Sequence, residues 1–235
     1  FKAKGITTMA EITRSSLLTG AALGVAATAV AVPALAAETA TCTYADTIPW
    51  DGQYDVVVMG AGFAGLAAAI YASREGASVL LFDVAPEWEA GGNSRYCAQI
   101  MRTGTDREKL IGYYEALYGE RSYDKDIIAA FIDGQLGLDD MLADELGANR
   151  DNLNNIVLGY PVESGEYPEY PGAEESKARS IGGCFDSGLF KLYRANAFAE
   201  PNIDFWYNAR GTKLVQDPQT KTIVGVEIEK DGQTR

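Results

Sequence analysis

Histidine is absent from the 235 residues of this sequence, and cysteine occurs three times, at Cys42, Cys97 and Cys184. Without histidine the chain can hold neither a Ser–His–Asp catalytic triad nor a histidine-ligated metal ion. The cysteines are too far apart for a CxxC zinc or redox motif, and no CxxCH sequence for haem attachment is present. We therefore predict no metal site in this chain and no disulfide framework, with a single disulfide as the alternative in an oxidising compartment.

Positively charged side chains are also few. The 20 Lys and Arg residues are outnumbered by 33 Asp and Glu residues, so the formal net charge is −13. Because nucleic acids are bound through clustered Lys and Arg, this balance predicts no nucleic-acid partner. The apolar share of 47% and the charged share of 23% are typical of a globular chain, and the length suffices for one sizeable domain.

The first 36 residues have the features of an export signal. Met9 is the expected natural start, Arg14 supplies positive charge, and residues 17–32 form an apolar run. Small residues at positions 34–36, in the order Ala-Leu-Ala, match a signal peptidase site. We therefore predict a signal peptide region over residues 1–36 and an extracytoplasmic location, in the periplasm or at the cell surface, after export.

Two further observations bear on export. Residues 13–18 are similar to a twin-arginine signal, although serine takes the place of the second arginine. The apolar run of about sixteen residues is short for a membrane span. An uncleaved signal that anchors the chain in a membrane is the alternative, and it would be the chain's one membrane contact. Residues 37–53 are then expected to form a polar linker that leads into the fold.

A strand, a glycine-rich loop, a helix and a second strand follow one another directly. Residues 54–59 are rich in valine, as in a parallel strand that is buried on both faces. Residues 63–75 predict a helix, and residues 78–82 predict a second strand that ends at Asp83. Between the first strand and the helix lies a complete G-x-G-x-x-G motif, made of Gly60, Ala61, Gly62, Phe63, Ala64 and Gly65.

Each part of this unit has a physical function in a dinucleotide-binding site. Gly60 permits the tight turn, Gly62 lets the backbone approach a diphosphate, and Gly65 lets the helix pack closely on the strand. The helix N-terminus offers free N–H groups and partial positive charge to the phosphates. Asp83 is expected to accept hydrogen bonds from the adenosine ribose. The pattern leaves FAD and NAD open, and a βαβ unit that binds no nucleotide is the structural alternative.

A second glycine-containing segment, Gly91, Gly92, Asn93 and Ser94, follows the second strand within a dozen residues. Together with the first motif it resembles the fumarate reductase/succinate dehydrogenase flavoprotein family, particularly its flavocytochrome-like and 3-ketosteroid dehydrogenase relatives. The resemblance implies FAD, with the segment running beneath the cofactor and Gly92, Asn93 and Ser94 in contact with it. Because Asn93 stands where membrane succinate dehydrogenases carry a histidine, the resemblance implies that FAD is bound without a covalent link.

The resemblance also implies a fold and an activity. The fold is α/β, a Rossmann-like FAD-binding domain with a parallel sheet, helices and a small antiparallel β region, of which residues 54–235 would be the N-terminal part. The activity is FAD-dependent reduction or formation of a C=C bond conjugated to a carboxylate or ketone, with a small-molecule substrate and a separate electron donor or acceptor protein. Family members carry their catalytic groups further along the chain, so no catalytic residue is assigned and this part alone is expected to be inactive.

Two other functions are compatible with the sequence. The chain could be a non-catalytic flavin-binding or electron-transfer fragment, because the substrate-binding half is not part of it. It could also be an NAD-dependent Rossmann dehydrogenase, although an NAD enzyme has no need of the Gly91–Ser94 segment. Where the family continues with a Gly-Gly pair, this sequence has Cys97-Ala98-Gln99-Ile100. We expect Cys97 to be an inert packing cysteine, with a redox thiol as the alternative.

The remainder of the chain predicts further elements. Apolar positions at helical spacing predict helices over residues 106–118 and 122–146, and a loop rich in Pro and Tyr is expected over residues 160–172. Arg179 is expected to open another helix, which runs to about residue 200. Its side chain is expected to form a surface salt bridge, with contact to substrate or to a flavin phosphate as the alternative. Asp231-Gly232 is a hairpin turn signal. Strands are predicted over residues 203–207, 212–216 and 222–230.

Overall fold

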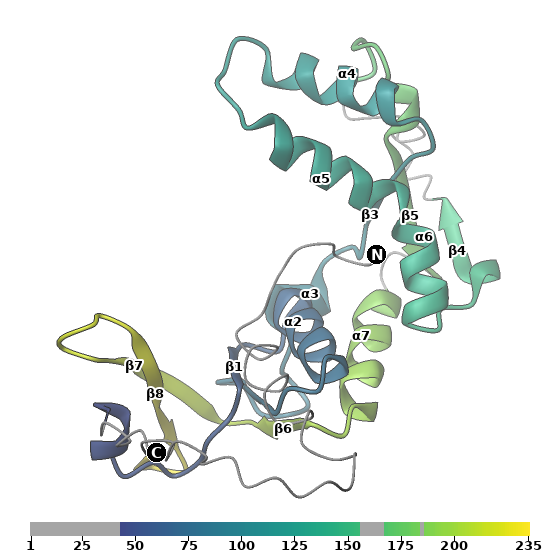
Figure 1. Ribbon diagram of the computed structural model, residues 1–235. Coiled ribbons are helices and arrows are strands. Elements are labelled where there is room, and N and C mark those ends of the chain that lie inside the picture. The colour runs from purple at the N-terminus through teal and green to yellow at the C-terminus, as the bar shows by residue number, and fades with distance from the viewer. Residues whose placement is uncertain (1–42, 156–166, 184–185) are drawn as a thin grey trace, which may run out of the picture. The chain divides into compact units, whose positions relative to one another are not determined.

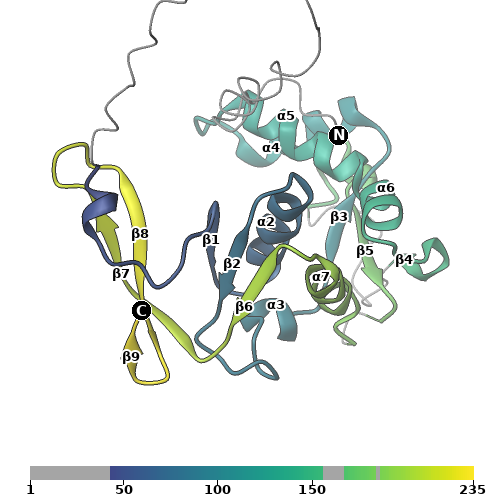
Figure 2. The ribbon, with the colours of Figure 1, turned by 60° about the horizontal axis from the view of Figure 1, so that its bottom comes forward.

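The computed structural model, drawn as a ribbon in Figure 1, describes residues 43–155, 167–183 and 186–235. Its central element is a parallel sheet in which β2 lies between β1 and β6, and the three strands lie side by side in Figure 2. These strands are β1 (Val56–Met59), β2 (Val79–Phe82) and β6 (Ile203–Trp206). All four residues of β2 are buried, since this strand has a neighbour on each side. The predicted α/β architecture is confirmed.

Helices α2 (Phe63–Arg74) and α7 (Gly188–Ala199) pack against one face of this sheet and against each other. The buried side chains of Leu66, Ile70 and Phe190 belong to the same hydrophobic cluster as Leu81 of β2. Removing each such side chain from water stabilises the fold by about 1.5–3 kcal/mol. This packing holds the N-terminus of α2, and therefore the glycine loop that precedes it, at the carboxyl end of β1.

The other face of the sheet is covered by an antiparallel sheet of β7 (Ala209–Gln216), β8 (Ile223–Lys230) and β9 (Gln233–Thr234). Ile228 of β8 is buried with Leu80 and Phe82 of the central strand. The turn predicted at Asp231-Gly232 is confirmed, because both residues have positive φ and β8 pairs with β9 across them. This sheet is the small antiparallel region that the sequence predicts.

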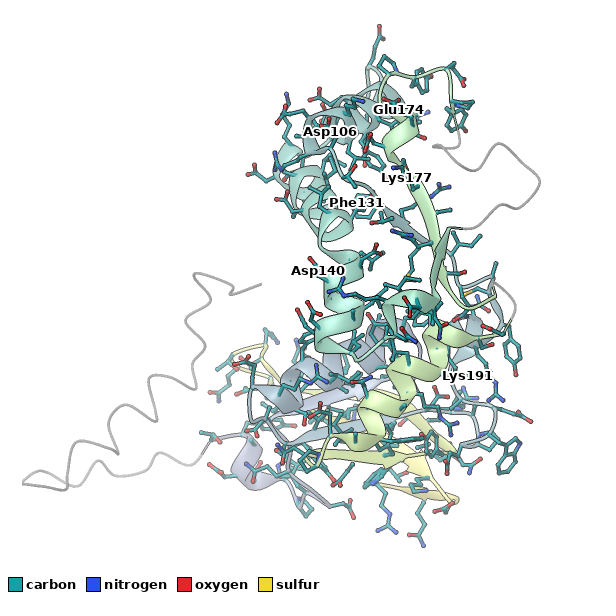
Figure 3. All side chains as sticks on the ribbon, turned by 90° about the vertical axis from the view of Figure 1, so that its right-hand side faces the viewer. Asp106, Phe131, Asp140, Glu174, Lys177 and Lys191 are labelled. Atoms are coloured by element: carbon teal, nitrogen blue, oxygen red, sulfur yellow. The ribbon has the colours of Figure 1, made fainter. Side chains whose placement is uncertain are left out.

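The remaining helices and strands form two further groups. Helices α4 and α5 pack on each other around Leu110 and Ile132. The η4 turn, on which Figure 3 labels Glu174, is joined to α4 by an ion pair of 3.0 Å between Lys109 and Glu174. A second antiparallel sheet has the order β3-β5-β4. The bounds of these elements are α3 (Gly92–Tyr96), β3 (Met101–Thr103), α4 (Arg107–Tyr118), α5 (Lys125–Leu136), α6 (Leu138–Asp140), the π-helical turn η2 (Met141–Glu145), the 3-10 turns η1 (Ala45–Thr47), η3 (Arg150–Asn152) and η4 (Ala173–Glu175), β4 (Leu153–Asn155) and β5 (Lys177–Ile181).

The helix predicted over residues 122–146 is wrong as a single element. It begins at Lys125, because the carboxylate of Asp124 caps it by accepting hydrogen bonds from the N–H groups of Asp126 and Ile127. It ends at Leu136, and Gly137 forms the C-cap. Two short helical turns complete the segment, the second with a π-type bond from Leu146 N to Met141 O. The helix predicted over residues 106–118 is confirmed as α4.

The helix predicted to begin at Arg179 is also wrong. Residues 177–181 form strand β5, the middle strand of its sheet, in which buried and partly buried residues alternate. The helix begins only at Gly188. Pairing with two strands distant in sequence decided this segment, and such pairing outweighs a weak local preference. Arg179 does form a salt bridge, to Asp139 at 2.6 Å between Nη2 and Oδ2, but the pair is partly buried and not at the surface as predicted.

The strand over residues 54–59 is confirmed as β1, but it is not buried on both faces. Val57 is 43% exposed and Met59 is 73% exposed. The reason is that β1 is an edge strand among the described residues, with β2 as its neighbour on one side. Residues 1–42 and 160–166, with the predicted signal and part of the predicted loop, lie outside the described residues. Within the described ranges, no helix has the length and apolar character that crossing a membrane requires.

Candidate dinucleotide site

The glycine loop connects the end of β1 to the start of α2 in a tight turn. Gly60 has a φ of +98°, and its N–H donates to Phe82 O of the neighbouring strand at 2.7 Å. A Cβ atom on Gly65 would overlap the carbonyl oxygen of Gly60 and lie 3.1 Å from its carbonyl carbon. Two of the three glycines are therefore required by the backbone itself. Gly60 is needed for its conformation, and Gly65 for the close contact between helix and loop.

Backbone N–H groups at the start of α2 are available to a ligand. Of the described residues, none accepts a hydrogen bond from the N–H of Gly62, Ala64 or Gly65. Ala64 is exposed, and the space where Gly60 would carry a Cβ holds no atom within 4 Å. A helix of twelve residues places partial positive charge at this end. The donors and the open backbone fit the diphosphate of a dinucleotide.

Asp83 directly follows β2 and contacts the same loop. Its Oδ2 atom accepts a hydrogen bond from the N–H of Ala61 at 2.8 Å, and its Oδ1 atom accepts one from the N–H of Ala85 at 2.8 Å. The backbone of Asp83 is held between Trp206 O and the N–H of Ala209, both at 2.9 Å. Each carboxylate oxygen has a second lone pair, so the side chain can still accept from a sugar hydroxyl. Its support of the loop was not foreseen from the sequence.

The segment Gly91–Ser94 contacts the loop at two of its four residues. Ser94 Oγ accepts a hydrogen bond from the N–H of Phe63 at 3.0 Å, so it occupies one of the helix N-terminal donors itself. A Cβ on Gly62 would lie 3.1 Å from this oxygen and 3.6 Å from Gly91 O. Gly92 and Asn93 are exposed on the first turn of α3. The structure therefore brings the loop, Asp83, Gly91 and Ser94 together, while no hydrogen bond joins Gly92 or Asn93 to the loop among the described residues.

Two residues near this segment differ from expectation. Cys97 is exposed, so its predicted packing role is wrong; its thiol lies 3.7 Å from Ser94 O. Gln99, to which the sequence analysis gave no function, is 1% exposed and hydrogen-bonded to both Ser94 O and the N–H of Phe190. One sequence signal did mark Gln99: it lies in the segment Cys97–Ile100, where this chain departs from the Gly-Gly pair of the family.

Tyr207 lies near Asp83 and also near the charged groups of Arg194 and Glu87. Arg194 pairs with Glu87 at 3.1 Å and lies over the ring of Phe198 at 4.8 Å from its centroid. Burial raises the pKa of the Tyr207 phenol, and the nearby Arg194 opposes this change. The Tyr207 side chain therefore stays neutral at ordinary pH and can serve as a hydrogen-bond donor. Among the described residues, no group of His, Cys, Asp or Glu is arranged to hold a metal ion.

The carboxylate of Asp186 holds the loop before α7, and the stability of the fold should therefore depend on pH. Hydrogen bonds from the N–H groups of Gly183, at 3.0 Å, and Gly188, at 2.9 Å, lower the pKa of Asp186 from its usual 3.8. A carboxylate with a lowered pKa stabilises the fold above its unfolded-state pKa, and this contribution is lost as the pH falls through the folded-state pKa. We expect Asp186→Ala to lower the thermal midpoint at pH 7 and pH 5, with a difference from wild type that shrinks below pH 3.8. Melting curves of both proteins across this range test this, and a difference independent of pH would contradict it.

Comparison with known proteins gives one family match. A family model described as FAD dependent oxidoreductase matches residues 55–235. The acrylate reductase flavoprotein subunit of Shewanella woodyi is 46% identical over 146 residues, which are 61% of this chain and 23% of that protein. This chain therefore spans about a quarter of the length of that relative.

Solved structures share the fold. The 3-ketosteroid-Δ4-(5α)-dehydrogenase of Rhodococcus jostii has a TM-score of 0.64 at 22% identity, over 82% of this chain and 45% of that one. The open conformation of a flavocytochrome c3 fumarate reductase has a TM-score of 0.57 at 26% identity, over 75% of this chain and 30% of that one. The expected α/β domain with its antiparallel region is thus present in known flavoproteins.

Proposed function

Because this chain belongs to the family of FAD-dependent oxidoreductases, we propose that it forms part of a flavoenzyme that reduces or forms a C=C bond conjugated to a carboxylate or ketone. The available N–H groups of Gly62, Ala64 and Gly65 carry the proposal, since they fit the diphosphate of the family's cofactor. Relatives that reduce acrylate and fumarate support the reaction class. Family membership also removes the NAD-dependent alternative.

Different residues of the site are proposed to bind different parts of FAD. The loop N–H groups bind the diphosphate, and Asp83 holds the loop through Ala61 while it accepts a ribose hydroxyl. Gly92 and Asn93, exposed beside Ser94, contact the part of FAD nearer the flavin ring. When bound, FAD supplies hydride exchange at flavin N5. Asn93 offers no imidazole for a covalent link, which supports non-covalent binding.

Location and partner follow from different observations. The predicted signal over residues 1–36 supports export of the protein to an extracytoplasmic compartment, with membrane anchoring by an uncleaved signal as the alternative. The relative from Shewanella woodyi is named a flavoprotein subunit, which supports a separate electron donor or acceptor protein. A small-molecule enoate or enone is the proposed substrate.

Reoxidation of the reduced holoprotein tests the proposal. The purified holoprotein is reduced anaerobically with dithionite, freed of excess reductant, and mixed with acrylate, fumarate or cyclohex-2-enone. We expect the flavin absorbance near 450 nm to return with at least one of these compounds. Saturated propionate and succinate are the matched controls and should leave the flavin reduced. Reoxidation by none of the unsaturated compounds, but by an electron-transfer protein, would favour the non-catalytic flavin carrier instead.

A further inference from the structure

Gln99 occupies a position at which a glutamine is unfavourable by itself. Its backbone φ is +58°, a left-handed conformation that costs an ordinary L residue free energy and costs glycine almost none. Its side chain is 1% exposed, although an amide loses hydrogen bonds to water on burial. Both costs persist only where surrounding contacts compensate for them.

Those contacts come from two parts of the chain that lie far apart in sequence. Gln99 Nε2 donates to Ser94 O at 2.6 Å and, more weakly, to Cys97 O at 3.3 Å. Gln99 Oε1 accepts from the N–H of Phe190, in the first turn of α7, at 2.9 Å. The side-chain amide thus uses its donors on the end of the Gly91–Ser94 segment and its acceptor on α7.

Further contacts connect the Gly91–Ser94 segment to α2 and α7. The ring of Phe190 lies so near Gly91 that a Cβ there would overlap it. Ser94 Oγ accepts the N–H of Phe63 at 3.0 Å, and the rings of Phe63 and Phe190 meet edge to face at 6.3 Å. Gln99 therefore holds Ser94 and Phe190 together, and these two residues in turn contact α2 and Gly91.

We propose that Gln99 is a positioning residue that fixes the Gly91–Ser94 segment against the start of α2 and so sets the geometry in which FAD is bound. The proposal rests on the proposed function as far as FAD binding is concerned, and it does not depend on the substrate. Gln99 acts on the site indirectly, through Ser94 O and through the Phe190 ring on Gly91.

A single-atom substitution in the holoprotein separates positioning from folding. In Gln99→Glu, the ionised carboxylate can still accept from Phe190 N–H, but it cannot donate to Ser94 O and is repelled by it. Because burial favours the protonated acid, whose O–H could donate, binding is measured across a pH series that extends to a pH at which this carboxyl is ionised. We expect FAD affinity, measured by reconstitution of the apoprotein, to fall about tenfold, the effect of one lost hydrogen bond. We also expect the visible circular dichroism of the bound flavin to change, because that signal reports the geometry around the ring.

Gln135→Glu is the matched control. Gln135 is 4% exposed and donates to the hydroxyl of Tyr114 at 2.7 Å on α4, with no contact to the glycine segments. We expect this variant to change the melting temperature while FAD affinity and the flavin signal stay at wild-type values. Equal FAD affinity and equal dichroism for Gln99→Glu and wild type would overturn the proposal.

A second variant keeps the proposal testable if Gln99→Glu does not fold. Gln99→Gly removes the amide and at the same time relieves the left-handed strain, so the backbone stays compatible with the fold. We expect it to be folded and to show the same loss of affinity and the same altered dichroism. Failure of both variants to fold would assign Gln99 to folding and refute a positioning role. Failure of enoates to reoxidise the flavin would refute the proposed reaction while leaving these readouts intact.

Discussion

Gly65→Ala is expected to abolish stoichiometric FAD binding by the holoprotein. The added methyl group would overlap the carbonyl oxygen of Gly60 and lie 3.3 Å from Val58 Cγ1. Because its nearest neighbour is backbone and not a flexible side chain, the helix and the loop must separate. That movement displaces the N–H groups of Gly62 and Ala64, which we propose to bind the diphosphate. We expect affinity to fall by more than about a hundredfold, the consequence of losing two or more such hydrogen bonds.

Flavin content of the purified variant, from its absorbance spectrum, measures this effect. Gly134→Ala is the control, since Gly134 also lies within a helix but a Cβ there would have no atom within 4 Å. This control should retain full flavin content and gain up to about 1 kcal/mol of stability from helix propensity. A yellow Gly65→Ala protein with one FAD per chain would show that the loop is not the diphosphate site.

Asp83→Asn is expected to have the second largest effect, a loss of FAD affinity of about a hundredfold. The two carboxylate oxygens of Asp83 accept the N–H groups of Ala61 and Ala85, and an asparagine can satisfy only one of them. Its NH2 group would face the other donor. Hydrogen bonds to charged groups contribute about 1.5–3 kcal/mol each, which corresponds to roughly ten- to over a hundredfold in a binding constant. The proposed contact with the ribose would be weakened by the same change.

Isothermal titration of the apoprotein with FAD measures this loss, and Asp55→Asn is its control. Asp55 precedes the same strand pair at its opposite end, where its Oδ2 atom accepts from Ser78 N and Ser78 Oγ, both at 2.8 Å. This variant should lower stability and leave FAD affinity nearly unchanged. If the two variants lose affinity equally, the effect of Asp83→Asn comes from the fold in general and Asp83 has no specific part in the site.

Segments in which burial agrees with the local sequence pattern were predicted most accurately. The valine-rich strand and the helix after the glycine loop were predicted to within two residues of the bounds of β1 and α2. The helix predicted to begin at Arg179 was wrong. Strand β5 was not recognised, because its mixture of Lys, Arg and Ser carries no clear strand period and its two partner strands lie elsewhere in the chain. The edge position of β1 could not be predicted either, since a sequence pattern does not reveal which strands are neighbours.

The amino-acid sequence by itself determined the unit from β1 to Asp83, because its parts are contiguous and each follows from local sterics: glycine at positive φ, apolar residues in the strands, and free donors at a helix start. Tertiary structure alone decided that Ser94 occupies one of those donors and that Asp83 supports the loop through Ala61. It also decided the hydrogen bond of Gln99 to Phe190, which lies 91 residues away. Such contacts depend on how segments far apart in the chain pack together, and no local pattern in the sequence encodes that arrangement.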